Sequence, residues 1–216
     1  MNKLLITQPV TIVANGDFPR HSIPIKILND SKCIIACDGA ADILIQKEYD
    51  VNYIIGDIDS LSKTNIIKYR DKIIKIENQS ENDLRKAISK LYNQGIKKIN
   101  IIAATGKRED HTLGNIFSIY QYKDDLEASI FTDFGVFKCI NKDATLKSFK
   151  GQQVSFFTND NTIKITSNGL MYNFNYNTIS TLFYGTLNQS TSNEVNVNLS
   201  HGKLLVFQEY KENQLL

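Results

Sequence analysis

The feature that most constrains the fold of this chain is a change of hydrophobic pattern near residue 142. Before that point, short apolar runs such as "VTIVANG", "CIIACDG" and "KINIIAATG" alternate with segments of helical periodicity. Strands that are apolar on both faces and are joined by helices indicate a mainly parallel sheet flanked by helices. The sequence therefore predicts an α/β domain over residues 1–142.

The clearest predicted helix lies within "ENDLRKAISKLYNQG", residues 81–95. Its apolar residues follow the i, i+3, i+4, i+7 rule, and Gly95 stands where a glycine commonly ends a helix. The four apolar positions are Leu84, Ala87, Ile88 and Leu91.

After residue 142 the helical pattern disappears. Short β-rich segments are separated by turn signals such as "NDN", "NG" and "HG", and "EVNVNLS" alternates so that Val195, Val197 and Leu199 share one face. This pattern is typical of an antiparallel sheet with one buried side. Residues 143–216 are therefore predicted to form an all-β sandwich domain.

Composition excludes several classes of function. A formal charge of +2 over 216 residues offers no general attraction to nucleic acid or to an anionic membrane. No segment has the length of apolar sequence that a membrane span needs, and the N-terminal apolar run is too short for a signal peptide. The odd number of cysteines predicts reduced thiols and a cytoplasmic location; they are Cys33, Cys37 and Cys139.

The stretch "YIIGDIDSL", residues 53–61, places Asp57 and Asp59 directly after a predicted buried strand. Two carboxylates about 5 Å apart repel by roughly 3 kcal/mol at an effective dielectric constant of about 20. Either these side chains separate into water or a cation lies between them.

Other predicted strands deliver acidic side chains to the same edge, because ligands of open parallel sheets bind beyond the carboxyl ends of the strands. Asp38 follows one strand, Asp83 begins a helix after another, and Asp110 stands between Arg108 and His111 after a third. Each of these residues alone is more often a turn or cap residue, for example with Ser80 as a helix cap and Asp83 in the first turn. Their recurrence at equivalent strand ends favours one shared site.

Oxygen ligands of this kind suit Mg²⁺, which proteins hold with a few carboxylates together with substrate phosphates. The segment "AATGKREDH" adds a glycine at a strand-to-helix turn, where backbone N–H groups favour phosphate. It matches neither the Walker A nor the dinucleotide-binding glycine motif. The residues alone therefore indicate metal-assisted phosphoryl or nucleotidyl chemistry without a P-loop.

The motifs "CDGAAD", "IIGDIDSL", Gln79-x-x-x-Asp83, "GKREDHTLGN" and "STSNEV" occur in an order that resembles the thiamine pyrophosphokinase family. The likeness covers roughly residues 10 to 208. It implies transfer of a pyrophosphoryl group from ATP to the hydroxyl of thiamine, with Mg²⁺, in a cytoplasmic homodimer whose sites are shared between subunits. It also implies that the first domain binds nucleotide and metal, whereas the β-domain binds thiamine and dimerises.

The resemblance assigns roles by matching motif. Metal ligands would be Asp57, Asp59 and Asp83, and these with Asp110 would form the catalytic set. Thiamine would contact Gln79, Ser192 and Asn193. The nucleotide would contact Asn15, Gly16, Asp38, Gly39, Arg108, His111 and Asn115. The general base stays open between Asp83 and Asp110.

Two departures affect the thiamine pocket. The family often has "DGG" where this chain has Ala40, and some members place a tryptophan near thiamine, whereas this chain has none. An aromatic such as Phe183 or Tyr184 is a candidate replacement. The alternative functions are another Asp-x-Asp metal-dependent enzyme, such as a nucleotide-sugar transferase or a phosphatase, and a non-catalytic regulator that binds thiamine or nucleotide.

Overall fold

The computed structural model describes residues 4–122 and 124–211, and the chain divides into two compact units between Asp133 and Phe134. The sequence placed this boundary after residue 142. It lies earlier because β7 (Gly135–Ile140) pairs along its whole length with β14 (Leu204–Glu209), which belongs to the second unit.

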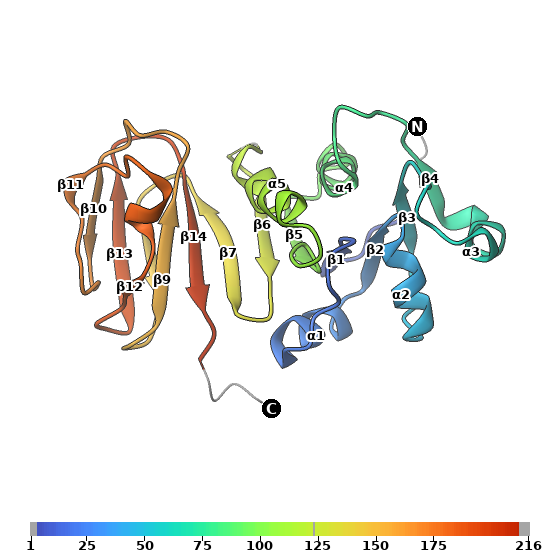
Figure 1. Ribbon diagram of the computed structural model, residues 1–216, viewed down its shortest axis with the longest axis horizontal. Helices are drawn as coiled ribbons and strands as arrows, with labels where there is room; N and C mark the ends of the chain where they lie inside the picture. Colours follow the sequence, from blue (N-terminus) through green and yellow to red (C-terminus); the bar gives the residue numbers. More distant parts are fainter. Residues whose placement is uncertain (1–3, 123, 212–216) are drawn as a thin grey trace. The chain divides into compact units, whose positions relative to one another are not determined.

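The first unit is built on a parallel sheet with the strand order β6-β5-β1-β2-β3-β4 (Figure 1). Its strands are β1 (Val10–Val13), β2 (Cys33–Cys37), β3 (Tyr53–Gly56), β4 (Ile73–Lys75), β5 (Lys98–Ile102) and β6 (Glu127–Phe131). β1, β2 and β5 lie in the interior of the sheet and are buried over most of their length. The predicted parallel α/β domain is confirmed.

Helices connect these strands on both faces of the sheet. They are α1 (Ser22–Asn29), α2 (Ala40–Gln46), α3 (Lys63–Lys68), α4 (Asp83–Tyr92) and α5 (Glu109–Tyr120), with a 3₁₀ turn at Arg70–Lys72. The chain adds β2, β3 and β4 on one side of β1 and then returns to the other side for β5 and β6. Because crossover connections are right-handed, α1 to α3 cover one face, and α4 and α5, which contact each other, cover the opposite face.

Helix α4 confirms the predicted apolar face, since Leu84, Ala87, Ile88 and Leu91 are all buried. Its N-terminal cap differs from the Ser80 alternative. The cap is Asn82, whose side-chain oxygen accepts a hydrogen bond from the Arg85 N–H at 2.9 Å. Asp83 is therefore the first residue of the helix, directly at its N-terminal end.

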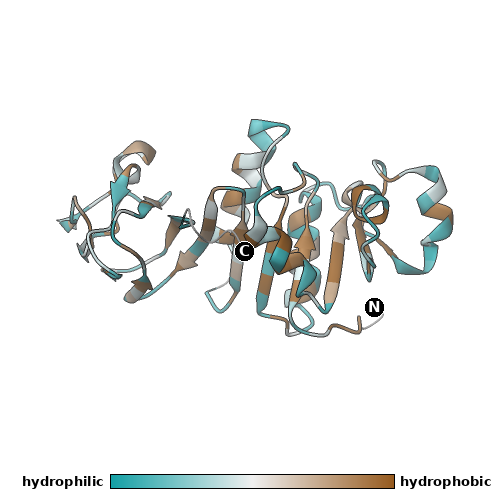
Figure 2. Cartoon of the chain, turned by 90° about the horizontal axis from the view of Figure 1, so that it is seen from below, coloured by the Kyte–Doolittle hydropathy of each residue, from teal (hydrophilic) through white to brown (hydrophobic). Residues whose placement is uncertain are grey.

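The core of the first unit lies between the sheet and its helices, and Figure 2 shows hydrophobic residues concentrated on its strands. Fully buried members include Ile12, Ile35, Ile54 and Ile101 on four neighbouring strands. These apolar strands carry polar residues only where they end, and their carboxyl ends all point to one edge.

The second unit consists of two antiparallel sheets. One has the order β12-β9-β14-β7, and the other has the order β11-β10-β13-β8. The remaining elements are β8 (Ala144–Lys147), β9 (Gln153–Phe157), β10 (Ile165–Asn168), β11 (Asn175–Asn177), a 3₁₀ turn at Leu182–Gly185, β12 (Asn188–Gln189) and β13 (Glu194–Leu199). The predicted alternation holds in β13, where Val195 and Val197 are buried in the core that both sheets share.

Within the described ranges, no helix combines the length and the apolar character needed to cross a bilayer.

Candidate functional site

The candidate site is a pocket of about 600 Å³ in the first unit, at the carboxyl ends of its strands. It lies where the strand order reverses, between β1 and β5, which is where open α/β sheets bind ligands. Its lining comprises Ala14, Asn15, Gly16, Cys37, Asp57, Asp59, Ser60, Gln79, Ser80, Glu81, Asn82, Asp83, Leu84, Lys86, Gly106, Lys107, Arg108, His111 and Asn115.

Gly16 brings the ends of β1 and β5 together. A Cβ atom at this position would lie only 2.3 Å from the Thr105 carbonyl oxygen, so any other residue would force the two segments apart. The Lys107 ammonium bonds to the Asn15 carbonyl oxygen at 2.9 Å and to its side-chain oxygen at 3.1 Å. The predicted pair Asn15 and Gly16 therefore lies beside a cationic segment that also lines the pocket.

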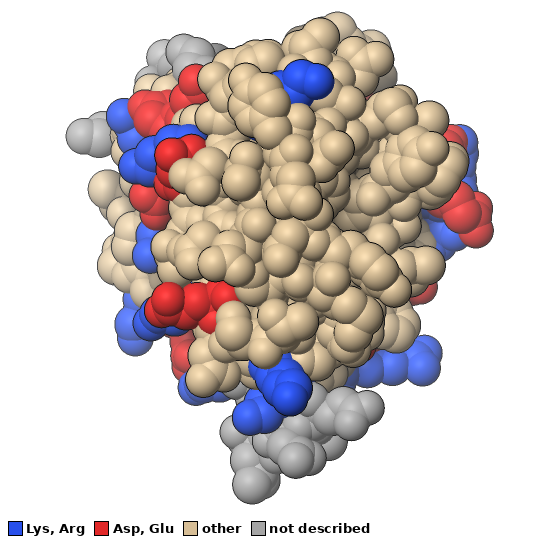
Figure 3. Space-filling view, turned by 90° about the vertical axis from the view of Figure 1, so that its left-hand side faces the viewer, with Lys and Arg blue, Asp and Glu red and all other residues tan. Residues whose placement is uncertain are grey.

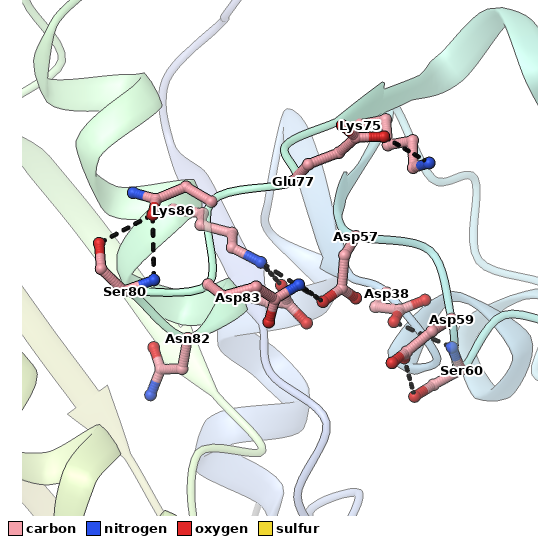
Figure 4. A network of polar contacts seen from close by, with 12 residues as sticks. Asp38, Asp57, Asp59, Ser60, Lys75, Glu77, Ser80, Asn82, Asp83 and Lys86 are labelled. Carbon is pink, nitrogen blue, oxygen red and sulfur yellow. Dashed lines mark hydrogen bonds and ion pairs between the residues drawn. The ribbon is translucent and has the colours of Figure 1, made fainter.

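Three carboxylates meet at this edge of the sheet. Asp38, Asp57 and Asp59 each place an oxygen within 4.8 Å of the others (Figure 4). Asp38 follows β2, and the other two residues follow β3. The sequence interpretation expected Asp38 close to the metal ligands and among the nucleotide contacts, and in the structure its carboxylate lies beside those of Asp57 and Asp59.

Backbone strain is concentrated at the same edge. Asp38, Ile58, Ala103 and Lys107 all have positive φ, between 44° and 69°, although none is glycine. A β-branched residue such as Ile58 rarely adopts this conformation, and strain of this kind persists where surrounding structure enforces it, commonly at functional sites. Here Ile58 lies in a bend between Asp57 and Asp59.

Asp38 is almost completely buried. One of its carboxylate oxygens accepts a hydrogen bond from the Ser60 N–H at 3.0 Å, and the other is buried with no hydrogen-bond partner. Burial, together with the neighbouring Asp59 and Asp83 carboxyls, raises the pKa of Asp38 to about 6, and the Ser60 N–H opposes this only in part. Gly39 allows the close approach, since a Cβ atom there would lie 3.1 Å from the Ser60 carbonyl oxygen.

Asp57 is held in its charged form. The Gln79 side-chain amide donates a hydrogen bond to it at 3.1 Å. This hydrogen bond lowers the pKa of Asp57, and the positive charge of Lys86 contributes in the same direction. Gln79, predicted as a thiamine contact, thus lies at the acidic side of the pocket.

Asp83 is paired with Lys86, a residue that the sequence interpretation did not single out. The Lys86 ammonium lies 2.9 Å from Asp83 and 3.7 Å from Asp57, and its side chain is only 2% exposed. Burial disfavours the ammonium, but the hydrogen bonds and charges of Asp83 and Asp57 outweigh this effect, so the pKa of Lys86 is raised. The sequence signal that could have identified Lys86 is its position three residues after Asp83, because residues i and i+3 are neighbours on a helix.

The other wall of the pocket is formed around the start of α5. Arg108 and Asp110 form an ion pair, with the guanidinium Nε 3.1 Å from a carboxylate oxygen. This bond lowers the pKa of Asp110 to about 2. Asn115 donates a hydrogen bond to the Ala104 carbonyl and accepts one from Asn82, which ties α5 to α4.

His111 joins Arg108 and Asn115 in lining the pocket, whereas Asp110 does not line it. Three of the residues predicted to contact the nucleotide therefore line the pocket together, and the Asp110 carboxylate is paired with Arg108.

Ser192 and Asn193 belong to the second unit and are exposed there, just before β13. The Ser192 hydroxyl donates a hydrogen bond to the Glu194 carbonyl, and the Asn193 carbonyl accepts one from the Ser148 N–H. Their backbone position in the β-unit is therefore well defined.

A hard divalent cation fits the acidic group. All donors are carboxylate oxygens, and the unpartnered oxygen of Asp38 is a buried acceptor that a cation would satisfy. No cysteine or histidine belongs to this group, which fits magnesium better than zinc.

Comparisons with known proteins agree with this geometry. Residues 25–131 match the family model described as "Thiamin pyrophosphokinase, catalytic domain", and residues 135–207 match "Thiamin pyrophosphokinase, substrate-binding domain". No curated protein sequence matches the chain.

Solved structures share the fold at low sequence identity. A thiamin pyrophosphokinase from Geobacillus thermodenitrificans is 19% identical, with 95% of this chain and 99% of that chain covered and a TM-score of 0.76. The enzyme from Candida albicans is 17% identical, with 96% of each chain covered and a TM-score of 0.76. The yeast enzyme is 17% identical, with 95% and 87% covered and a TM-score of 0.76. Because the two family models match consecutive parts of the chain, the chain belongs to the thiamin pyrophosphokinase family, whose members are thiamine diphosphokinases.

Proposed function

We propose that this chain transfers a pyrophosphoryl group from ATP to the hydroxyl of thiamine in a Mg²⁺-dependent reaction, giving thiamine diphosphate and AMP. The observation that carries the proposal is the group Asp38, Asp57 and Asp59, of which Asp57 and Asp59 line a pocket that Lys107 and Arg108 also line. Acids that would otherwise repel one another are suited to a metal ion that also binds phosphate oxygens.

Asp38, Asp57 and Asp59 would hold the metal, and Asp83 stands next to them at the start of α4. Bound Mg²⁺ supplies charge neutralisation for the phosphate oxygens. Asp83 belonged to the predicted metal set and stays a candidate, with its carboxylate engaged by Lys86.

The nucleotide phosphates would lie at the Gly106 to His111 segment. Gly106 has a φ of +83°, and α5 begins at Glu109, so the backbone turns directly into a helix N-terminus. Lys107, Arg108 and His111 add cationic or hydrogen-bonding side chains where the phosphate charge would lie. Asn15, Gly16 and Asn115 would complete the wall around the nucleotide.

In the reaction, the thiamine hydroxyl oxygen forms a bond to the β-phosphorus of ATP while the bond from that phosphorus to the oxygen bridging the α-phosphate breaks. AMP leaves with that oxygen, and the hydroxyl proton passes to a carboxylate. Asp83 suits the proton acceptor role better than Asp110, because Asp83 lines the pocket, whereas Asp110 does not line it and is paired with Arg108.

The proposal includes a homodimer in which Ser192 and Asn193 of one subunit meet thiamine at the Gln79 side of the other subunit's pocket. Support comes from exposed apolar side chains on the second unit, among them Phe183 and Tyr184, whose rings lie against each other. Exposed apolar groups gathered on one surface are typical of an interface. The free cysteines among the described residues suit a cytoplasmic location.

The deciding experiment is incubation with ATP, thiamine and Mg²⁺, followed by chromatographic identification of products. Equal amounts of AMP and thiamine diphosphate are expected, with no turnover in excess EDTA. Release of ADP or inorganic phosphate would indicate another Asp-x-Asp enzyme. Binding of both ligands without product would indicate a regulator.

A further inference from the structure

Lys86 occupies an unusual position for a lysine. It lies on the side of α4 opposite the apolar residues Leu84, Ala87, Ile88 and Leu91, where a helix normally faces water. Its side chain is nevertheless 2% exposed, and its ammonium reaches the acidic edge of the sheet (Figure 4).

The two acids that Lys86 touches come from different elements. Asp57 follows β3, and Asp83 begins α4. A buried charge is costly unless it is paired, and removing one partner of a buried pair leaves the other uncompensated. Lys86 therefore joins two segments that are distant in the sequence and sets where each carboxylate lies.

The other cations of the pocket do not share this role. Lys107 bonds to Asn15, and Arg108 is paired with Asp110. Among the residues that the structure describes, Lys86 is the one lysine or arginine in an ion pair with Asp57 or Asp83.

We propose that Lys86 is a positioning residue of this site, a role that rests on the proposed function: its ammonium holds Asp57 and Asp83 in place from α4 and partly offsets their charge. The same ammonium opposes a divalent cation at Asp57, since like charges repel. Lys86 thus orients the acids for turnover while it weakens metal binding in the absence of nucleotide.

The test uses Lys86→Met, which keeps an unbranched side chain of similar length and removes the charge. The matched control is Lys90→Met, one turn further along α4, with the same change of chemistry at a partly exposed lysine. Three quantities are measured: Mn²⁺ binding without nucleotide by electron paramagnetic resonance, kcat and KM for thiamine, and the unfolding midpoint in EDTA.

For Lys86→Met we expect Mn²⁺ to bind about three- to tenfold more tightly, because the ammonium beside Asp57 no longer repels it. We expect kcat to fall about tenfold or more, with KM for thiamine changed less than about threefold, because orientation is lost and substrate binding is not. Lys90→Met should leave all three quantities unchanged. Lys86→Arg, which keeps the charge, should retain weak Mn²⁺ binding and recover part of kcat.

A double-mutant cycle with Asp83→Asn separates positioning from a structural role. If Lys86 acts through Asp83, Lys86→Met lowers kcat much less in the Asp83→Asn background than in the original protein. The proposal would be overturned if the losses of kcat in the two single variants were fully additive in the double variant, or if Lys86→Met left kcat unchanged. It would also be overturned if Lys86→Met bound Mn²⁺ more weakly and had a lower unfolding midpoint. If the original protein makes no thiamine diphosphate, the proposed function is wrong, but this result does not test Lys86. Mn²⁺ binding by the original protein, Lys86→Met and Lys86→Arg still decides the role of Lys86.

Discussion

At the scale of single residues, the acidic edge combines charge repulsion with backbone strain. Asp57 and Asp59 flank Ile58, whose φ is +69°, and Asp38 itself has a φ of +44°. Neither feature favours the folded protein on its own. Both make sense when a cation and a phosphate group complete the site.

Asp57→Asn and Asp59→Asn should each lower turnover by about 100-fold or more, because both residues are proposed metal ligands and loss of a ligand removes several kcal/mol of charge stabilisation. Thiamine diphosphate formation at saturating Mg²⁺ is the measurement. The control is Asp71→Asn, whose side chain is 92% exposed on the first unit and should change nothing. Full turnover in either site variant would remove the metal role from that residue.

Asp38 should make the metal-free protein sensitive to pH. Its pKa rises from 3.8 to about 6 on folding, so the folded state holds a proton that the unfolded state has lost. The stability that Asp38 contributes is therefore present at low pH and is lost as the pH rises through about 6.

Asp38→Asn keeps the shape of the side chain and removes this titration. Relative to the original protein in EDTA, the variant should gain on the order of 1–3 kcal/mol of unfolding free energy between about pH 4 and about pH 7.5. Denaturant unfolding at both pH values checks this. A constant difference between the two proteins would show that Asp38 ionises normally.

At the scale of elements, the carboxyl end of β3 and the start of α4 are packed without spare room. A Cβ atom on Gly56 would lie 2.9 Å from the Asp38 Cβ and 3.1 Å from an Asp83 carboxylate oxygen. A glycine at the last position of β3 is therefore what lets three acidic segments converge.

Gly56→Ala should cost about 1–3 kcal/mol of unfolding free energy through overpacking and should lower turnover, because both acids must move. Gly114→Ala is the matched control within α5, where an added Cβ meets nothing within 4 Å. That variant should be neutral or up to about 1 kcal/mol more stable, since alanine favours helix. Comparable behaviour of the two variants in thermal unfolding and turnover would contradict the packing argument.

The start of α4 shows what local pattern could not decide. Several polar residues precede the helix, and either Ser80 or Asn82 could serve as the cap by composition. Asn82 is the cap, and its amide also donates a hydrogen bond to the Asn115 side chain in the middle of α5. That contact with α5 joins residues 33 positions apart in the sequence, and a local pattern does not encode it.

At the scale of the whole molecule, the second unit presents a surface with few charges. Figure 3 shows this side, with lysine, arginine and acidic residues mainly toward its margins. Large apolar side chains are exposed between residues 171 and 187, namely Met171, Tyr172, Tyr176, Leu182, Phe183, Tyr184 and Leu187. Apolar area of this kind fits the proposed contact between subunits.

Light scattering should therefore give twice the 24.5 kDa mass of the chain. Phe183→Asp should shift the protein toward monomer and lower turnover, because a buried charge at an interface is costly and the shared site is lost. Ile67→Asp, at an exposed residue of the first unit, is the control and should stay dimeric. A monomeric, fully active original protein would exclude the shared site.

Periodicity along the chain was sufficient to predict both folds, the buried face of α4, the inward valines of β13 and the convergence of acids at one sheet edge. Side-chain direction repeats every two residues in a strand and every 3.6 in a helix, so this information is local. Only the tertiary structure decided the placement of β7 in the second unit and the burial of Lys86. Both features depend on contacts between segments that are distant in the sequence: β7 pairs with β14, and Lys86 contacts Asp57 at the carboxyl end of β3. No local pattern encodes such contacts.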